Sequence, residues 1–180
     1  DRLIDERLEK GSFSPALAEF WVSAAFQRRK FNIHRRLRKL QHHREPGRAA
    51  VIRYLDCLAE NYETARREAK VFAPSRLRHH FGKVMKAHRD WLRAHTLGWG
   101  KVGYVYATFD DPRKVVSWLA DWKTQPNVES WMLYNLVIAL QKLHRYDAAL
   151  EVIRYAVAMR HWQDLYETFQ SWAAFEEVLR

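Results

Sequence analysis

Histidine is the residue type in this chain that most readily binds metals or transfers protons. Nine histidines are present, and two pairs, His42-His43 and His79-His80, are adjacent. Neighbouring residues on a helix point about 100° apart, so neither pair is well placed to share one metal ion. No Cys, Asp or Glu stands at a spacing that would complete a ligand set, and His80 lies near Arg76 among cations that would repel a metal. The sequence therefore predicts no metal site and no cofactor.

No pattern of hydroxyl, thiol or carboxylate side chains indicates a catalytic site. A serine or cysteine nucleophile requires a base and a group that orients the base, and neither a G-x-S-x-G motif nor a P-loop occurs. Gly98, Gly100 and Gly103 give the spacing G-x-G-x-x-G, but no strand precedes them, so a helix start and a close helix crossing explain them better. Asp110-Asp111 could hold a cation, yet helix capping is the simpler explanation. We predict that the chain is not an enzyme.

The composition indicates a globular all-α protein. Hydrophobic residues make up 48% of the 180 residues and charged residues 29%, with only six Gly and five Pro. The most abundant residue types are good helix formers. The single Cys57 is predicted to be a buried apolar filler, and it fits a reducing compartment, which favours a cytoplasmic location. No apolar run approaches the roughly 20 residues that span a bilayer, and the start at Asp1 fits a segment of a longer protein.

Caps and breakers divide the sequence into short helices joined by turns. Ser14 and Asp111 are expected N-caps because each precedes a proline, and Ser75 is expected to cap the long helix after Pro74. Turns are expected at residues 30–32, 46–47, 126–127 and 144–145. The expected helices cover residues 15–29, 33–43, 48–61, 62–72, 76–95, 96–109, 112–125, 129–143, 146–159 and 161–179. Short connections make neighbouring helices antiparallel.

The positive charge is concentrated in the N-terminal half. Residues 1–101 contain 23 Lys and Arg against 11 Asp and Glu, whereas residues 102–180 contain 8 against 10. The densest stretch, residues 27–44, has eight basic residues and no acidic one. It is either a solvated helix face or a surface for an anionic partner. The candidate basic patch consists of Arg28, Arg29, Lys30, Arg35, Arg36, Arg38 and Lys39.

The C-terminal half contains an internal repeat of 34 residues. Two copies align Trp99, Gly103, Tyr106, Asp111, Val115, Leu119 and Trp122 with Leu133, Val137, Leu140, Arg145, Ala149, Ile153 and Ala156. This pattern resembles the tetratricopeptide repeat (TPR) family, whose unit is a 34-residue helical hairpin. The resemblance covers residues 96–163, with a weaker copy over 46–74 that carries Ala49, Ile52, Tyr62 and Ala65.

The resemblance implies one domain over residues 1–180, in which antiparallel hairpins stack as a right-handed TPR-like α-solenoid. Residues 1–95 would form basic, divergent hairpins and a long helix, residues 96–163 two TPR-like hairpins, and residues 164–180 a capping helix. Val137 stands where the family has a small residue, which is expected to widen the helix crossing there.

In TPR arrays the first helices line a groove that binds peptides. Carried over by position, the groove residues are Lys101, Tyr104, Thr108, Asn135, Ile138, Lys142 and Trp172. The Lys/Asn/Arg set with which one subgroup binds a free C-terminal carboxylate is incomplete here. The resemblance therefore implies a non-enzymatic protein-interaction scaffold whose partner is a peptide or an acidic protein surface.

Two other functions remain open. A basic helical-repeat protein that binds nucleic acid is indicated by the cations of residues 28–44 and 70–101. A docking or regulatory domain of a larger enzyme is indicated by ends that fall within a helical pattern.

Overall fold

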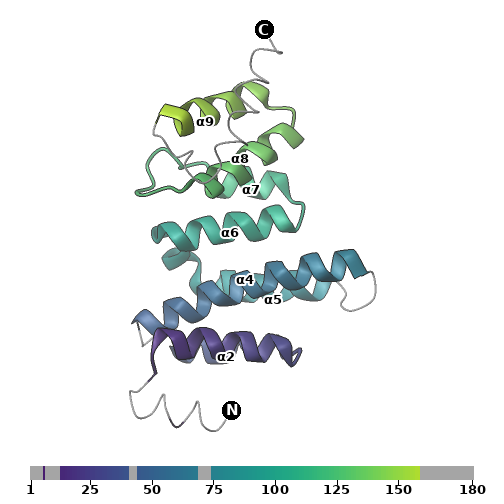
Figure 1. Ribbon diagram of the computed structural model, residues 1–180, viewed down its shortest axis with the longest axis vertical. Coiled ribbons are helices and arrows are strands. Elements are labelled where there is room, and N and C mark those ends of the chain that lie inside the picture. Colours follow the sequence, from purple (N-terminus) through teal and green to yellow (C-terminus); the bar gives the residue numbers. More distant parts are fainter. Residues whose placement is uncertain (1–5, 7–12, 41–43, 69–73, 159–180) are drawn as a thin grey trace. The chain divides into compact units, whose positions relative to one another are not determined.

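The computed structural model describes residue 6 and residues 13–40, 44–68 and 74–158 of the chain. In these segments all regular secondary structure is helical and no strand occurs, which confirms the all-α class. The helices are α2 (Pro15–Gln27), α3 (His34–Leu40), α4 (Arg44–Glu68), α5 (Pro74–Ala94), α6 (Thr96–Thr108), α7 (Pro112–Trp118), α8 (Ser130–Lys142) and α9 (Tyr146–Ala158), and all except α3 are labelled in Figure 1. They fall into two compact units, Asp1–Trp91 and Leu92–Arg180.

None of the described helices combines the length and the apolar character that crossing a membrane would require.

The expected caps begin two of the helices. The Ser14 side chain accepts a hydrogen bond from the backbone N of Leu17 at 3.3 Å, and Pro15 occupies the first position of α2. Asp111 caps α7 in the same way, accepting from Lys114 N at 3.3 Å. Each cap satisfies a backbone N–H that has no partner inside its helix.

Three helices end in the same turn geometry. Arg29, Asp110 and His144 follow α2, α6 and α8, and each has a φ of 56°, in the left-handed region. The next residue then donates its N–H to a carbonyl five positions back, in the pairs Lys30 to Ala25, Asp111 to Tyr106 and Arg145 to Leu140. This motif closes the helix and reverses the chain. The predicted turn at His144-Arg145 is thereby confirmed.

In the first unit, α4 packs against both α2 and α3 (Figure 1). Its central Tyr54 is fully buried and donates its hydroxyl hydrogen to the Phe31 carbonyl at 3.0 Å. The ring of Phe26, on α2, meets Tyr54 edge to face with 5.1 Å between centroids. Tyr54 therefore fixes the loop between α2 and α3, which carries part of the basic stretch.

The predicted hairpin over residues 46–74 is wrong. The sequence predicted separate helices over residues 48–61 and 62–72, whereas α4 continues without a break from Arg44 to Glu68. Asn61 does not open a turn, because its Nδ2 donates to the Cys57 carbonyl of the preceding helical turn at 2.8 Å. Leu58, Tyr62 and Ala65 are all buried. One apolar stripe therefore continues across residues 61 and 62, where two helices were expected to meet.

Pro46 and Gly47 lie in the first turn of α4 and do not separate two helices. A proline is tolerated there because the first N–H groups of a helix have no partner within it. The expected N-cap at Ser75 is also wrong, since α5 already begins at Pro74.

In the second unit, consecutive helices pack in the order of two hairpins. α6 contacts α7 and α8, α7 contacts α8, and α8 contacts α9 (Figure 1). Trp99 on α6 is fully buried, and its backbone carbonyl accepts a hydrogen bond from Trp118 Nε1 at 2.9 Å. The glycines of α6 permit this packing, because a Cβ on Gly103 would lie 2.8 Å from Leu119.

The helix predicted over residues 112–125 is shorter than expected. It ends at Trp118, and turns follow up to residue 127. Asp121 holds this segment, because its carboxylate accepts from Trp99 Nε1 at 3.0 Å and from Gln125 Nε2 at 3.1 Å and pairs with Arg93 Nη2 at 3.1 Å. Trp118 and Trp122 are nevertheless both buried, as predicted for core residues.

Candidate functional site

Six of the seven predicted groove residues lie in the described part of the chain and form what we call the α6–α8 surface. Lys101, Tyr104 and Thr108 follow each other at helical spacing along α6, and Asn135, Ile138 and Lys142 do so along α8. All six are partly or largely exposed. The seventh, Trp172, lies outside the described residues.

Two interactions join the α6 and α8 parts of this surface. The Lys101 ammonium lies 5.1 Å from the centre of the Trp131 ring, a cation–π contact. Near the other end of α6, Lys142 Nζ pairs with Asp110 Oδ1 at 2.6 Å. Trp131 therefore belongs to this surface. It precedes Asn135 by one helical turn on α8.

Asn135 retains hydrogen-bonding capacity at the centre of the α6–α8 surface. Its Nδ2 donates to the Trp131 carbonyl at 2.9 Å. An asparagine amide has two N–H donors and one carbonyl acceptor, so one N–H and Oδ1 stay available for a peptide group. A shallow cleft of about 20 Å³ lies beside it, lined in part by Ile138, Val115 and Lys142. Among the described groups, the buried Thr108 Oγ1 has no hydrogen-bond partner.

The structure brings three residues of the candidate basic patch together. Arg29, Lys30 and Arg36 line one pocket, whereas Arg28 follows α2 and does not. Arg38 instead lies close enough to His88 to lower the pKa of that imidazole. The side chains of Arg35 and Lys39 are outside the described part of the chain. The patch of seven residues as a whole stays a prediction.

The pocket that contains three of these cations is strongly basic, and we call it the basic pocket. It has a volume of about 590 Å³. Six of its nine described lining residues are basic and none is acidic; the lining comprises Arg29, Lys30, Phe31, Asn32, Ile33, Arg36, Arg76, His79 and His80. Sequence reasoning missed Arg76, His79 and His80 as partners of the first basic stretch. The available signal was that both segments are basic, but nothing in the spacing indicates that they meet.

His80 is the most buried polar side chain of the basic pocket, with 7% of its surface exposed. Burial, followed by the charges of His34, His79, Lys83 and Arg76, lowers its pKa to about 4. The imidazole is therefore neutral at pH 7. Its Nδ1 is buried without a hydrogen-bond partner among the described groups. The ring lies between those of Phe31 and His34, with centroid distances of 6.3 and 5.8 Å.

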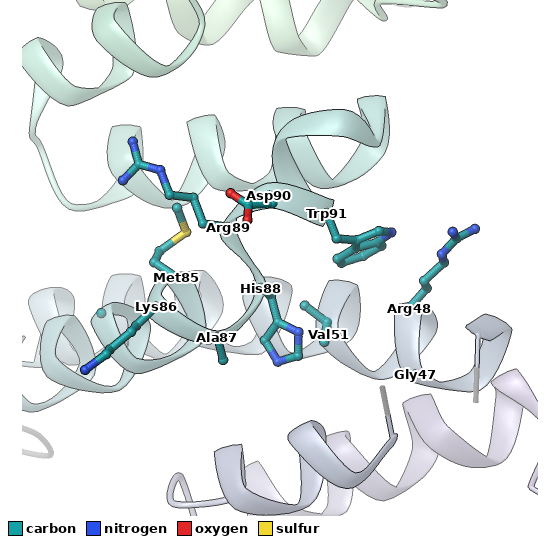
Figure 2. A pocket seen from close by; sticks show the side chains of 11 residues that line it. Gly47, Arg48, Val51, Met85, Lys86, Ala87, His88, Arg89, Asp90 and Trp91 are labelled. Carbon is teal, nitrogen blue, oxygen red and sulfur yellow. The ribbon is translucent and has the colours of Figure 1, made fainter. Parts of the chain in front are cut away.

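A larger cavity, of about 780 Å³, lies between the beginning of α4 and the end of α5. Figure 2 shows His88 and Val51 in its centre and Arg48 beside Trp91, where Arg48 Cζ is 5.9 Å from the ring centroid. His88 is 6% exposed, and burial, with a smaller effect of Arg38, lowers its pKa to about 4. The described lining contains no hydroxyl or thiol, and its polar side chains are those of Arg48, Lys86, His88, Arg89, Asp90 and Trp91.

The possible metal ligands and the single thiol can be located within the described residues. In the described segments no group of three or more His, Cys, Asp or Glu residues could hold a metal ion. Cys57 is 2% exposed, and burial raises the pKa of its thiol to about 11. Its predicted position as a buried apolar filler is confirmed.

No protein-family model matches this chain, and no curated protein or solved structure does so either. The resemblance to the TPR family therefore rests on the residues of the 34-residue repeat and stays a prediction.

Proposed function

We propose that this chain is a non-enzymatic protein-interaction module of TPR-like hairpins, whose α6–α8 surface binds an extended peptide segment with an acidic side chain. The order of helix contacts carries the proposal. α6 contacts both α7 and α8, and α8 contacts α9, which is the neighbour pattern of tandem helical hairpins. In such an array the first helix of each hairpin contributes to one shared surface, here α6 and α8.

The chemistry of the α6–α8 surface supports an extended peptide as the ligand. Asn135 can donate to a peptide carbonyl and accept from a peptide N–H at the same time. Lys101, beside Trp131 on one side of Asn135, favours a partner with a carboxylate, whereas the Lys142 ammonium on the other side already pairs with Asp110. Trp131 and Ile138 add partly exposed apolar area between the polar groups.

Selection of peptides from a random library against the whole chain tests the proposal. We expect enriched peptides to contain Asp or Glu, and Asn135→Ala to weaken their binding about tenfold, since hydrogen bonds within an interface are lost. Arg113→Ala, an exposed change on α7 outside this surface, serves as the matched control and should leave binding unchanged. Peptides that bind Asn135→Ala and the unmodified chain equally well would place the binding surface elsewhere. Failure to enrich any peptide would contradict the proposed function.

A further inference from the structure

The basic pocket has the composition of a site for a small, doubly charged anion. Arg29, Lys30 and Arg36 come from the end of α2, the following loop and α3, and Arg76 comes from the beginning of α5. Three of these four side chains carry a guanidinium group and one an ammonium group, and no carboxylate is among the described lining residues. A pocket lined by several cationic side chains attracts anions.

His80 is a second observation that points to a ligand, independent of the cations. It is more than nine-tenths buried, lines the pocket, and has an Nδ1 without a hydrogen-bond partner among the described groups. A buried polar atom without a partner is costly, and such atoms are rare in folded proteins. An oxygen atom of a bound anion would supply the missing hydrogen bond.

We propose that the basic pocket binds the phosphate group of a small phosphomonoester. A phosphate offers several acceptor oxygens, which suit three guanidinium groups and one ammonium group that converge from separate helices. The pocket volume of about 590 Å³ lies within the range for small-molecule sites, so the remainder of the ligand also fits. This site belongs to the unit Asp1–Trp91 and does not depend on peptide binding by the α6–α8 surface.

The lining favours a small phosphomonoester over single-stranded nucleic acid. Proteins that bind single strands stack successive bases on exposed aromatic rings. The one aromatic carbocycle among the described lining residues, Phe31, is 4% exposed and packs edge to face on Phe26. It therefore cannot serve as a stacking platform. The pocket recognises the anion and not a base.

Calorimetric titration of the whole chain with inorganic phosphate, methyl phosphate and an unphosphorylated twelve-nucleotide single strand distinguishes these ligands. We expect both phosphates to bind, and Arg76→Gln and Arg36→Gln each to weaken binding about tenfold, as for the loss of a charge-assisted hydrogen bond. Arg113→Gln removes the same charge from the other unit and should have no effect. Circular dichroism spectra verify that each variant folds.

Three results would overturn the proposal. The first is absence of phosphate binding to the unmodified, folded chain. The second is that Arg113→Gln weakens phosphate binding as much as Arg76→Gln does, which would indicate that net charge alone attracts the anion. The third is binding of the oligonucleotide without binding of either phosphate, which would make nucleic acid the ligand.

The His80 ring provides a readout that a general charge effect would not give. Sulfate is the probe, because it stays a dianion between pH 4 and 8. The ring faces His34 on α3 and His79, Arg76 and Lys83 on α5, and these positive or titrating groups all favour its neutral form. An anion bound at Nδ1 favours the charged form, so saturating sulfate should raise the pKa of His80 in an NMR titration. A His80 pKa that does not move under saturating sulfate would contradict the proposal.

Discussion

A methyl group added at Gly103 tests the close approach of α6 to the buried Leu119. A Cβ built on Gly103 would lie 2.8, 2.9 and 3.0 Å from Cδ2, Cδ1 and Cγ of Leu119. Contacts below 3.0 Å require the neighbour to move, and Leu119 is fully buried and has little room to do so. Gly103→Ala is therefore an overpacking substitution.

Two opposing effects determine the size of the change in stability. Alanine gains about 1 kcal/mol over glycine inside a helix. Overpacking a well-filled core costs roughly 1–3 kcal/mol. Because three Leu119 atoms are affected and not a single flexible end, we expect the steric cost to dominate. Gly103→Ala should then lower the free energy of unfolding of the second unit by about 1 kcal/mol.

Gly82→Ala is the matched control, because no atom lies within 4 Å of a Cβ built at that exposed position of α5. It should stabilise its own unit by about 0.5–1 kcal/mol through helix propensity alone. Urea unfolding followed by circular dichroism gives the change in midpoint. Hydrogen exchange of the α6 and α4 amides assigns it to a unit. If Gly103→Ala stabilises the protein as Gly82→Ala does, the close contact with Leu119 is refuted.

Three further predictions concern one partly exposed carboxylate and two buried titratable groups. Asp121→Ala should destabilise the second unit by about 1–3 kcal/mol in urea unfolding, because Trp99, Arg93 and Gln125 lose a shared acceptor. Asp121→Asn should cost less, and equal stability of all three chains would contradict this network. Burial raises the pKa of the Cys57 thiol to about 11, so Cys57 should react with a thiol reagent at pH 8 only after urea unfolds the chain. Fast reaction of the folded chain would show that this thiol is accessible. The pKa of His88 is lowered to about 4 in the folded chain. Between pH 4 and the ordinary pKa of about 6.5, the His88 imidazole therefore takes up a proton when the chain unfolds. Stability should therefore fall as pH decreases from about 6.5 to 4, and His88→Gln should flatten that dependence in thermal melts.

Local signals in the sequence determined most helix positions in the second unit. Asp111 before Pro112 predicted the start of α7, and the break at His144-Arg145 predicted the turn between α8 and α9. Such signals are reliable because caps and turns depend on hydrogen bonds between residues a few positions apart. The burial of Cys57 followed from the apolar pattern around it.

The errors arose where distant residues decide the local structure. α4 continues past residue 61, where the sequence predicted the boundary between two helices, because the apolar stripe that includes Tyr62 stays buried. α7 ends at Trp118 because Asp121 is held by groups from α5 and α6 and from its own turn. In both cases tertiary contacts outweigh helix propensity, which is a weak effect for each residue.

The sequence by itself determined the all-α class, the caps at Ser14 and Asp111, the buried thiol and the excess of positive charge up to residue 101. Only the tertiary structure decided which cations meet. Arg29 and Arg36 share a pocket with Arg76 and His80 because the α2–α3 loop and α3 lie beside the beginning of α5. Helical periodicity reports which face of a helix is buried, but it does not report which other helix covers that face. The basic pocket, which depends on that pairing, could therefore be found only in the folded chain.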